Sequence, residues 1–205
     1  MEQTLGVAHG LFAERGFADV TMEEIAAEVG VTKPLLYNYF GNKERLYIAC
    51  MEQAGDSLTK TIGASIAETV SPGDALGAGV RAFFAFLDSD RAAWAVLFDE
   101  TLPNSGEVAE KVAAYRGQIV ALVSQSLLAQ VPEARRGAAR VEIEALSAAL
   151  LGAAEELARW WLRTEAISAE KAAELLISTV EPGIRARSEA AVSPTSKPGK
   201  GTQKE

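Results

Sequence analysis

The chain has 205 residues, of which 48% are hydrophobic and 7% aromatic, and its formal net charge is −8. This length allows one domain or two small ones with an ample buried core, and no apolar window approaches the roughly 18 residues of a membrane span. A single cysteine and a single histidine exclude a disulfide framework and argue against a Cys/His zinc site, and the acidic total argues at face value against nucleic acid.

Helical periodicity dominates the chain, because apolar residues recur at offsets of three and four and no segment alternates for long enough to suggest a strand. We therefore expect an all-α fold with helices near residues 2–15, 22–29, 33–39, 43–68, 73–88, 90–99, 105–130, 138–164 and 168–181. Pro182 is expected to stop or kink the last helix. Residues 188–205 are polar and rich in Pro, Gly and Lys, which predicts a disordered tail.

The most informative stretch begins at Thr21. Thr21 and Glu24 have the spacing of a capping box, and Gly30 suits the left-handed residue that ends a short helix. Thr32 is then expected to cap a second helix, and Pro34 is tolerated in its first turn. Two short helices around a glycine-centred turn predict a helix-turn-helix.

The second helix of this motif has one buried and one outward face. Leu36 and Phe40, four residues apart, are expected to be buried. The outward positions in its N-terminal half are then Lys33, Pro34, Leu35, Tyr37 and Asn38. In helix-turn-helix proteins this half of the second helix enters the major groove of DNA.

One run of residues is similar to a known family. Thr21-x-x-x-Ile25-Ala26-x-x-x-Gly30-Val31-Thr32-x-x-x-x-Tyr37-x-Tyr39-Phe40-x-x-Lys43-x-x-Leu46 resembles the DNA-binding domain of the TetR family of bacterial transcriptional repressors, and Leu11-Phe12-x-x-x-Gly16-Phe17 resembles the end of its first helix. The resemblance implies a three-helix DNA-binding domain at residues 1–46. It also implies a helical effector-binding and dimerisation domain at residues 47–187, followed by the tail.

The resemblance also implies roles that suit the chemistry of each side chain. The five outward residues would face base edges: lysine donates to guanine, asparagine pairs with adenine, and apolar groups meet thymine methyls. The phosphate-binding set would comprise Thr21, Tyr37, Tyr39 and Lys43, and Thr32 is also assigned to the DNA interface. Ordinary packing is the alternative for the two tyrosines, and a solvated helix start is the alternative for Lys43. Glu23 and Glu24 place acid near the expected DNA and predict weak nonspecific affinity.

The predicted helix at 138–164 carries two adjoining apolar stripes and must bury more than one side. The stripe with more small residues predicts a two-fold symmetric interface, and the resemblance implies the same dimer, built from the last two helices. The residues assigned to it are Ile143, Ser147, Leu151, Ala154, Ala158 and Leu162, joined by Leu175 and Leu176. The alternative is a helix that is central in a monomer. In a dimer, two recognition helices about 34–36 Å apart would span a palindromic operator.

The ligand site is expected where aromatic residues converge. In the family such residues line a pocket for an effector, here of unknown identity and expected to be hydrophobic. The candidates are Phe83, Phe84, Trp94, Phe98, Tyr115, Trp160 and Trp161. Core packing is the alternative for each of them.

No glycine-rich phosphate loop, paired metal-ligand motif or nucleophile elbow occurs in the sequence, so we expect neither an enzyme nor a cofactor. Cys50 is interpreted as a buried small hydrophobe and His9 as a structural residue with satisfied hydrogen bonds. The N-terminus does not resemble a secretory signal, which favours the cytoplasm and, when DNA is bound, the bacterial nucleoid.

The resulting hypothesis is a homodimeric repressor that leaves its operator when an effector binds. DNA and effector would bind different spacings of the paired recognition helices, so each ligand weakens binding of the other. The alternative is a helical small-molecule-binding or protein-interaction protein with a non-functional helix-turn-helix. The charge distribution supports the first hypothesis: residues 1–29 carry a net charge of −5, residues 30–46 carry +2, and the remainder carries −5. The positive block is the predicted recognition helix and its continuation, so the acidic total does not exclude DNA.

Overall fold

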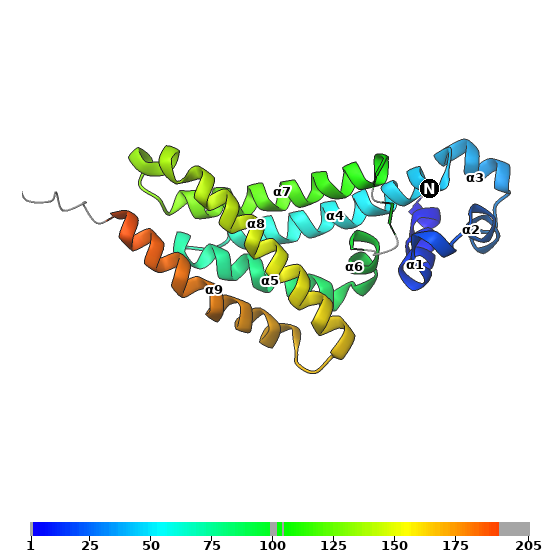
Figure 1. Ribbon diagram of the computed structural model, residues 1–205. Coiled ribbons are helices and arrows are strands. Elements are labelled where there is room, and N and C mark those ends of the chain that lie inside the picture. Colours follow the sequence, from blue (N-terminus) through cyan, green and yellow to red (C-terminus); the bar gives the residue numbers. More distant parts are fainter. Residues whose placement is uncertain (1, 99–101, 104, 193–205) are drawn as a thin grey trace, which may run out of the picture.

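The computed structural model describes residues 2–98, 102–103 and 105–192, and statements about the structure refer to these residues (Figure 1). The described chain is all-helical, with no strand in these ranges, which confirms the predicted fold class. None of the helices in this part of the chain is long and apolar enough to span a bilayer. The helices are α1 (Glu2–Asp19), α2 (Met22–Val29), α3 (Lys33–Phe40), α4 (Lys43–Ala67), α5 (Ala75–Ser89), α6 (Arg91–Leu97), α7 (Glu107–Ala129), α8 (Glu133–Thr164) and α9 (Ala169–Val192), with a 3₁₀ turn at Pro72–Asp74.

The molecule is elongated, with α1, α2 and α3 gathered at one end and α5, α7, α8 and α9 forming the larger body (Figure 1). Helix α4 runs from the small end into the body beside α7, and it contributes to two hydrophobic cores. Its first turns bury Leu46 and Tyr47 against α1 and α2, whereas Leu58 and Ile62 lie in the core of the body. The predicted domain boundary at residue 46 therefore falls within a continuous helix.

Three predicted helix ends differ from the structure by four residues or more. Helix α1 continues to Asp19, although Gly16 (φ 77°) interrupts its helical geometry, and α8 begins at Glu133 rather than 138. Helix α9 runs through Pro182 to Val192. Pro182 and Ser178, whose carbonyl group loses its usual partner, are both exposed, so water can replace the missing hydrogen bond. Residues 188–192 of the predicted tail are thus helical, and 193–205 lie outside the described residues.

Close packing between helices explains two glycines of the body. A Cβ atom on Gly55 of α4 would lie 2.6 Å from Cε1 of Tyr115 on α7. A Cβ atom on Gly79 of α5 would lie 3.2 Å from Cδ1 of Ile66 on α4. Glycine lets α7 and α5 approach α4 at these points, and both contacts border the cavities described below.

Candidate DNA interface and effector cavity

The turn before α2 has the predicted capping box. The backbone N–H of Glu24 donates to Oγ1 of Thr21 (3.3 Å), and the backbone N–H of Thr21 donates to Oε2 of Glu24 (2.9 Å). Gly30 ends α2 in the left-handed region (φ 78°). Hydrogen bonds from Thr21 and Arg15 lower the pKa of the Glu24 carboxyl group to about 2. This carboxylate is therefore ionised at neutral pH and fixes the start of α2 against α1.

Helix α3 presents the predicted faces. Leu36 is 1% exposed, and Phe40 is partly buried against the same core. Leu35 and Tyr37 are exposed, and Tyr39 is 65% exposed, which is incompatible with the packing alternative for its ring. One detail is wrong: Thr32 occupies the N-cap position, but its side chain makes no capping hydrogen bond.

Two groups predicted to bind phosphate are engaged within the chain. The Nζ atom of Lys43 donates to the carbonyl oxygens of Phe17 (2.8 Å) and Ala18 (3.4 Å) and lies 4.4 Å from the centroid of the Phe17 ring. The hydroxyl group of Thr21 donates to Oε2 of Glu24 (2.8 Å). The Lys43 contacts hold the end of α1 against the start of α4, and the Thr21 contact closes the first turn of α2, so both residues position the motif in the absence of DNA.

Lys33, at the start of α3, forms an ion pair with Glu23 of α2 and lies 5.6 Å from the centroid of the Tyr37 ring. The hydrogen bond between the two charged groups raises the pKa of Lys33 and lowers that of Glu23. Both side chains are about half exposed. DNA that uses this ammonium group must therefore compete with a carboxylate that the protein itself supplies.

Replacing Glu23 by glutamine is expected to strengthen binding to operator and nonspecific duplexes severalfold, since it frees Lys33 for a phosphate or a base. The slope of log affinity against log salt concentration should steepen by about one, which is the contribution of a single additional phosphate contact. Fluorescence anisotropy over a salt series measures both effects. Glu28→Gln, at the other end of α2, removes the same charge without touching the pair; an equal gain in this control would contradict the role of the Glu23–Lys33 contact.

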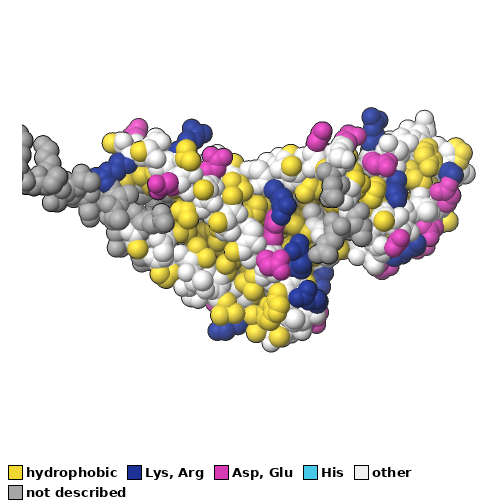
Figure 2. Space-filling view, viewed as in Figure 1, with side chains coloured by type: hydrophobic (Ala, Val, Ile, Leu, Met, Phe, Trp, Pro, Cys, Tyr) yellow, Lys and Arg dark blue, Asp and Glu magenta, His cyan; other side chains and the backbone are white. Residues whose placement is uncertain are grey.

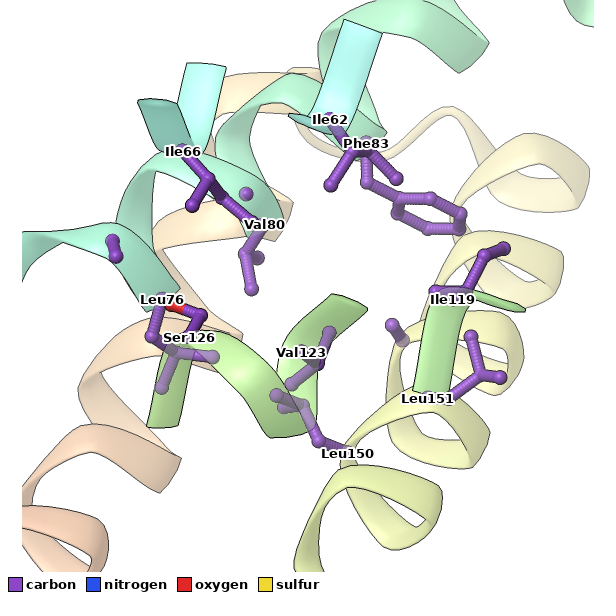
Figure 3. Close-up of a pocket in the computed structure, with 13 residues that line it drawn as sticks. Ile62, Ile66, Leu76, Val80, Phe83, Ile119, Val123, Ser126, Leu150 and Leu151 are labelled. Carbon is purple, nitrogen blue, oxygen red and sulfur yellow. The ribbon is translucent and has the colours of Figure 1, made fainter. Parts of the chain in front are cut away.

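The body contains a cavity between α4, α5, α7 and α8, with about 510 Å³ of empty space that is partly open to solvent (Figure 3). Its lining residues are aliphatic apart from Phe83 and Ser126. The lining residues are Ile62, Ile66, Ala75, Leu76, Gly79, Val80, Phe83, Ile119, Val123, Ser126, Leu150, Leu151 and Ala154. We call this the aliphatic cavity. Such a wall suits a hydrocarbon chain and offers no charged partner.

A second, smaller cavity lies between α4, α6 and α7. Ile119 lines this cavity as well as the aliphatic one. Its wall contains Tyr115 and Arg116, and the remaining lining residues are Met51, Gly55, Leu58, Leu97, Phe98 and Val112. We call this the polar cavity, after Arg116 and Tyr115 among its lining residues.

The polar cavity is bordered by interhelical contacts. Nε of Arg116 donates to Oε1 of Glu155 (2.9 Å), a buried carboxylate on α8 that also pairs with Nη2. The hydroxyl group of Tyr115 donates to Oδ1 of Asp56 (3.3 Å) and to the carbonyl oxygen of Glu52 (3.4 Å). Burial and, secondarily, the nearby Asp56 charge raise the pKa of Tyr115 to about 12, so the phenol stays neutral.

The predicted aromatic ligand set is only partly brought together. Phe83 lines the aliphatic cavity, and Phe98 and Tyr115 line the polar one. The other four candidates line neither: Phe84 packs edge-on against Trp161 (6.0 Å), Trp94 stacks on Phe98 (4.1 Å), and Trp160 is 37% exposed. Aliphatic wall residues escaped the sequence analysis because they show the same periodicity as core residues.

The predicted dimer stripe is corrected by the structure. Ile143, Ser147, Leu151, Ala154 and Ala158 of α8 are buried within the chain, and so is Leu176 of α9. Leu162 is partly buried, and Leu175 is 44% exposed. The exposed side of α8 carries a different set of small and apolar residues, namely Val141, Ala145, Ala148, Ala149, Gly152, Ala153 and Trp160. Uncharged side chains dominate the front face crossed by α8 and α9 (Figure 2).

Helix α6 connects the two ends of the molecule. The buried hydroxyl group of Tyr47 on α4 donates to the carbonyl oxygen of Val96 (2.6 Å), whose side chain belongs to the core of α1, α2 and α3. The next residue, Leu97, belongs to the core of the body and lines the polar cavity. A shift of α6 caused by a molecule in that cavity would therefore reach the helix-turn-helix directly.

Cys50 and His9 are the single cysteine and the single histidine of the chain. Cys50 is buried, which raises the pKa of its thiol to about 12 and confirms its interpretation as a small hydrophobe. His9 does not have the satisfied hydrogen bonds that we expected, because its Nε2 atom is buried without a partner among the described residues. In the same part of the chain no group of His, Cys, Asp and Glu could hold a metal ion.

Comparisons with known proteins cover both ends of the molecule. Residues 5–50 match the model of "Bacterial regulatory proteins, tetR family", and residues 72–181 match that of "Tetracyclin repressor-like, C-terminal domain". The chain is 28% identical over 167 residues to the HTH-type transcriptional activator FasR of Mycolicibacterium smegmatis, covering 80% of this chain and 72% of that protein.

Solved structures share the fold over most of its length. A TetR-like transcriptional regulator from Rhodococcus sp. RHA1 is 27% identical, with a TM-score of 0.72, over 90% of this chain and 94% of that chain. The transcriptional regulator FadR from Bacillus subtilis, solved in complex with stearoyl-CoA, is 18% identical with a TM-score of 0.71, over 87% and 98% of the two chains.

Proposed function

Since the chain belongs to the TetR family of bacterial regulatory proteins, and is thus a ligand-responsive DNA-binding transcriptional regulator rather than an enzyme, we propose which effector class it takes and how it meets DNA. Its effector is an amphipathic molecule with a long aliphatic part and an anionic head, such as a fatty acid or an acyl thioester. The protein acts in the cytoplasm as a homodimeric repressor, with its DNA-binding unit at residues 1–46 and its effector-binding unit at 47–187.

One observation carries the effector class: the residues that line the aliphatic cavity include no charged side chain, and Ser126 is the one polar residue among them. Burying a hydrocarbon chain there gains about 25 cal/mol per Å² of apolar surface, whereas a polar ligand would lose its hydration without replacement. Arg116 lines the adjoining polar cavity, and its guanidinium, which is paired with Glu155 in the protein without effector, suits a carboxylate or phosphate. The stearoyl-CoA bound to the Bacillus subtilis FadR supports an acyl chain in a protein of this fold.

We assign DNA recognition to the exposed face of α3. Asn38 and Lys33 carry the hydrogen-bonding groups that read bases. Tyr37 and Tyr39, whose rings are exposed, contact the phosphate backbone of the DNA. The exposed small residues of α8, together with Leu175 of α9, form the homodimer surface. Dimerisation places two copies of α3, and thus two small basic surfaces, on a palindromic operator.

Effector and DNA oppose each other through a two-state equilibrium. An occupant of the polar cavity displaces Leu97 and, through the Tyr47–Val96 hydrogen bond, changes the angle of α4 and the spacing of the paired α3 helices. Because the coupling is reciprocal, operator DNA should weaken effector binding by the same factor.

Palmitoyl-CoA is expected to raise the melting temperature of the protein and to release operator DNA, whereas coenzyme A without an acyl chain should do neither. Differential scanning fluorimetry and anisotropy with an operator selected from random duplexes measure the two effects. Val123→Trp, which fills the aliphatic cavity, should abolish both, and Ala121→Trp on the exposed side of α7 should leave them intact. Equal responses to palmitoyl-CoA and coenzyme A would contradict the proposed effector class.

A further inference from the structure

The DNA-binding unit at residues 1–46 has four Lys or Arg side chains, and three of them are engaged within the chain. Arg15 and Lys33 form ion pairs with carboxylates of α2, and Lys43 donates to carbonyl oxygens at the end of α1. The fourth, Arg45, is exposed and forms neither an ion pair nor a side-chain hydrogen bond with any residue that the structure describes. A phosphate group can therefore reach this guanidinium without breaking an existing contact.

Arg45 lies in the first turn of α4, beside the turn that follows the recognition helix. Gly41 ends α3, and the side chain of Asn42 accepts a hydrogen bond from the backbone N–H of Arg45 (2.8 Å) at the start of α4. A Cβ atom on Gly41 would lie 3.6 Å from Cδ and 3.7 Å from Nη1 of Arg45. The arginine side chain thus folds back over this turn, and its guanidinium lies at the C-terminal end of α3.

This place and this side chain suit the sugar–phosphate backbone of DNA. When a recognition helix lies in the major groove, the segments beside its C-terminal end meet the backbone, as in the homeodomain. A guanidinium is planar, always charged and able to donate two parallel hydrogen bonds to phosphate oxygens. Tyr39, two residues before Gly41, is 65% exposed and is a further donor near this end of α3.

Lys43, which the sequence predicted to bind phosphate, is less available than Arg45. Its Nζ atom donates to the carbonyl oxygen of Phe17 (2.8 Å) and lies 4.4 Å from the centroid of the Phe17 ring. Moving this ammonium group to a phosphate would remove the donor from a carbonyl group at the end of α1. A phosphate contact through Lys43 would therefore weaken the attachment of α1 to α4.

We infer that Arg45 binds a DNA phosphate beside the C-terminal end of α3, and that Lys43 positions the helices instead of contacting DNA. This inference rests on the proposed recognition role of α3. It divides between two residues of one helical turn the two tasks that a single lysine was expected to perform. Arg45 supplies affinity for any duplex, because a phosphate contact carries no sequence information.

The salt dependence of DNA binding distinguishes a phosphate contact from a positioning role. Each phosphate contact contributes about 0.9 to the slope of log affinity against log salt concentration. Arg45→Gln is expected to reduce the steepness of this slope by about 0.9 per protomer, equally on a selected operator and on a random-sequence duplex. Its melting temperature should equal that of the wild type, because the Arg45 side chain is exposed.

Lys43→Gln is expected to show the opposite behaviour. It should lower the melting temperature by about 2–4 °C, because the hydrogen bonds to the end of α1 are lost, and it should leave the salt slope unchanged on both duplexes. Fluorescence anisotropy between about 50 and 200 mM salt gives the slopes, and differential scanning fluorimetry gives the melting temperatures.

Lys60→Gln is the matched control for net charge. Lys60 is an exposed cation on the same helix, roughly 22 Å further along its axis than Arg45. This separation exceeds the Debye length of about 10 Å at 0.1 M salt, so the slope should not change. If Lys60→Gln reduced the slope as much as Arg45→Gln, the effect would reflect net charge, and the Arg45 contact would be overturned.

The remaining outcomes separate two failures. If the wild type binds no duplex in a salt-dependent manner, the recognition role of α3 fails, and the Arg45 contact fails with it. If the wild type shows a normal salt slope that Arg45→Gln leaves unchanged, only the Arg45 contact is overturned. A reduced slope in Lys43→Gln would overturn the division of roles between the two cations.

Discussion

Replacing Phe12 by alanine is expected to lower the free energy of unfolding by about 3–5 kcal/mol and to abolish operator binding. Phe12 is 1% exposed and lies edge-on to Tyr47 of α4, with ring centroids 4.9 Å apart. Phe17 completes this aromatic cluster, at 6.3 Å from Phe12 and 5.0 Å from Tyr47. The cluster joins α1 to α4, the two helices that hold α2 and α3, so a cavity at its centre would loosen the recognition helix.

Urea unfolding followed by circular dichroism gives the loss of stability, and anisotropy with labelled operator gives the loss of binding. Leu11→Ala is the matched control: it removes an apolar side chain from the adjacent position of α1, but Leu11 is only partly buried. Its effect on unfolding should be clearly smaller. Equal losses in both variants would show that the aromatic cluster does not organise the DNA-binding end.

Replacing Arg116 by alanine is expected to cost about 2–3 kcal/mol of stability, because it leaves the Glu155 carboxylate buried without its partner. The Glu155 side chain is only 5% exposed, and Arg116 contacts both of its oxygen atoms. The expected cost is below that of a fully buried pair, since the Arg116 side chain is 51% exposed and water can enter when it is removed. The same variant should weaken binding of anionic effectors, because Arg116 lines the polar cavity.

The double variant Arg116→Leu with Glu155→Leu distinguishes charge burial from lost packing. It should recover most of the stability, because apolar residues can replace a buried ion pair at little cost, yet it should still bind anionic effectors weakly. Arg81→Ala is the exposed comparison: its pair with Glu174 is about half exposed on both sides and should contribute at most about 1 kcal/mol. If the double variant were as unstable as Arg116→Ala, the unpaired carboxylate would not be the cause.

The helix-turn-helix could be predicted from sequence because its determinants are local. Thr21 and Glu24 are three residues apart, and both capping hydrogen bonds form within that turn. Leu36 is buried while Leu35 and Tyr37 are exposed, as the helical period requires. The pairing of Lys33 with Glu23 was not predicted, because it depends on the angle between α2 and α3.

The wide apolar arc of α8 shows where local patterns stop being informative. The sequence indicated that two sides of this helix are apolar, but Ser147 and Ala158, assigned to a dimer, are fully buried in the chain. Val141 and Trp160 lie on the exposed side instead. Both stripes satisfy the same helical period, so only the positions of the neighbouring helices decide which of them faces solvent.

The sequence by itself determined the all-α fold, the family and the recognition helix, since hydrogen bonds and apolar spacing within one or two turns specify them. Only the tertiary structure decided which residues surround the cavities, which face of α8 remains exposed, and which charges near the recognition helix are already paired. Arg116 and Glu155, or Ile62 and Leu150, are distant along the chain and meet because whole helices pack. Helical periodicity identifies a buried side chain but does not identify its neighbour.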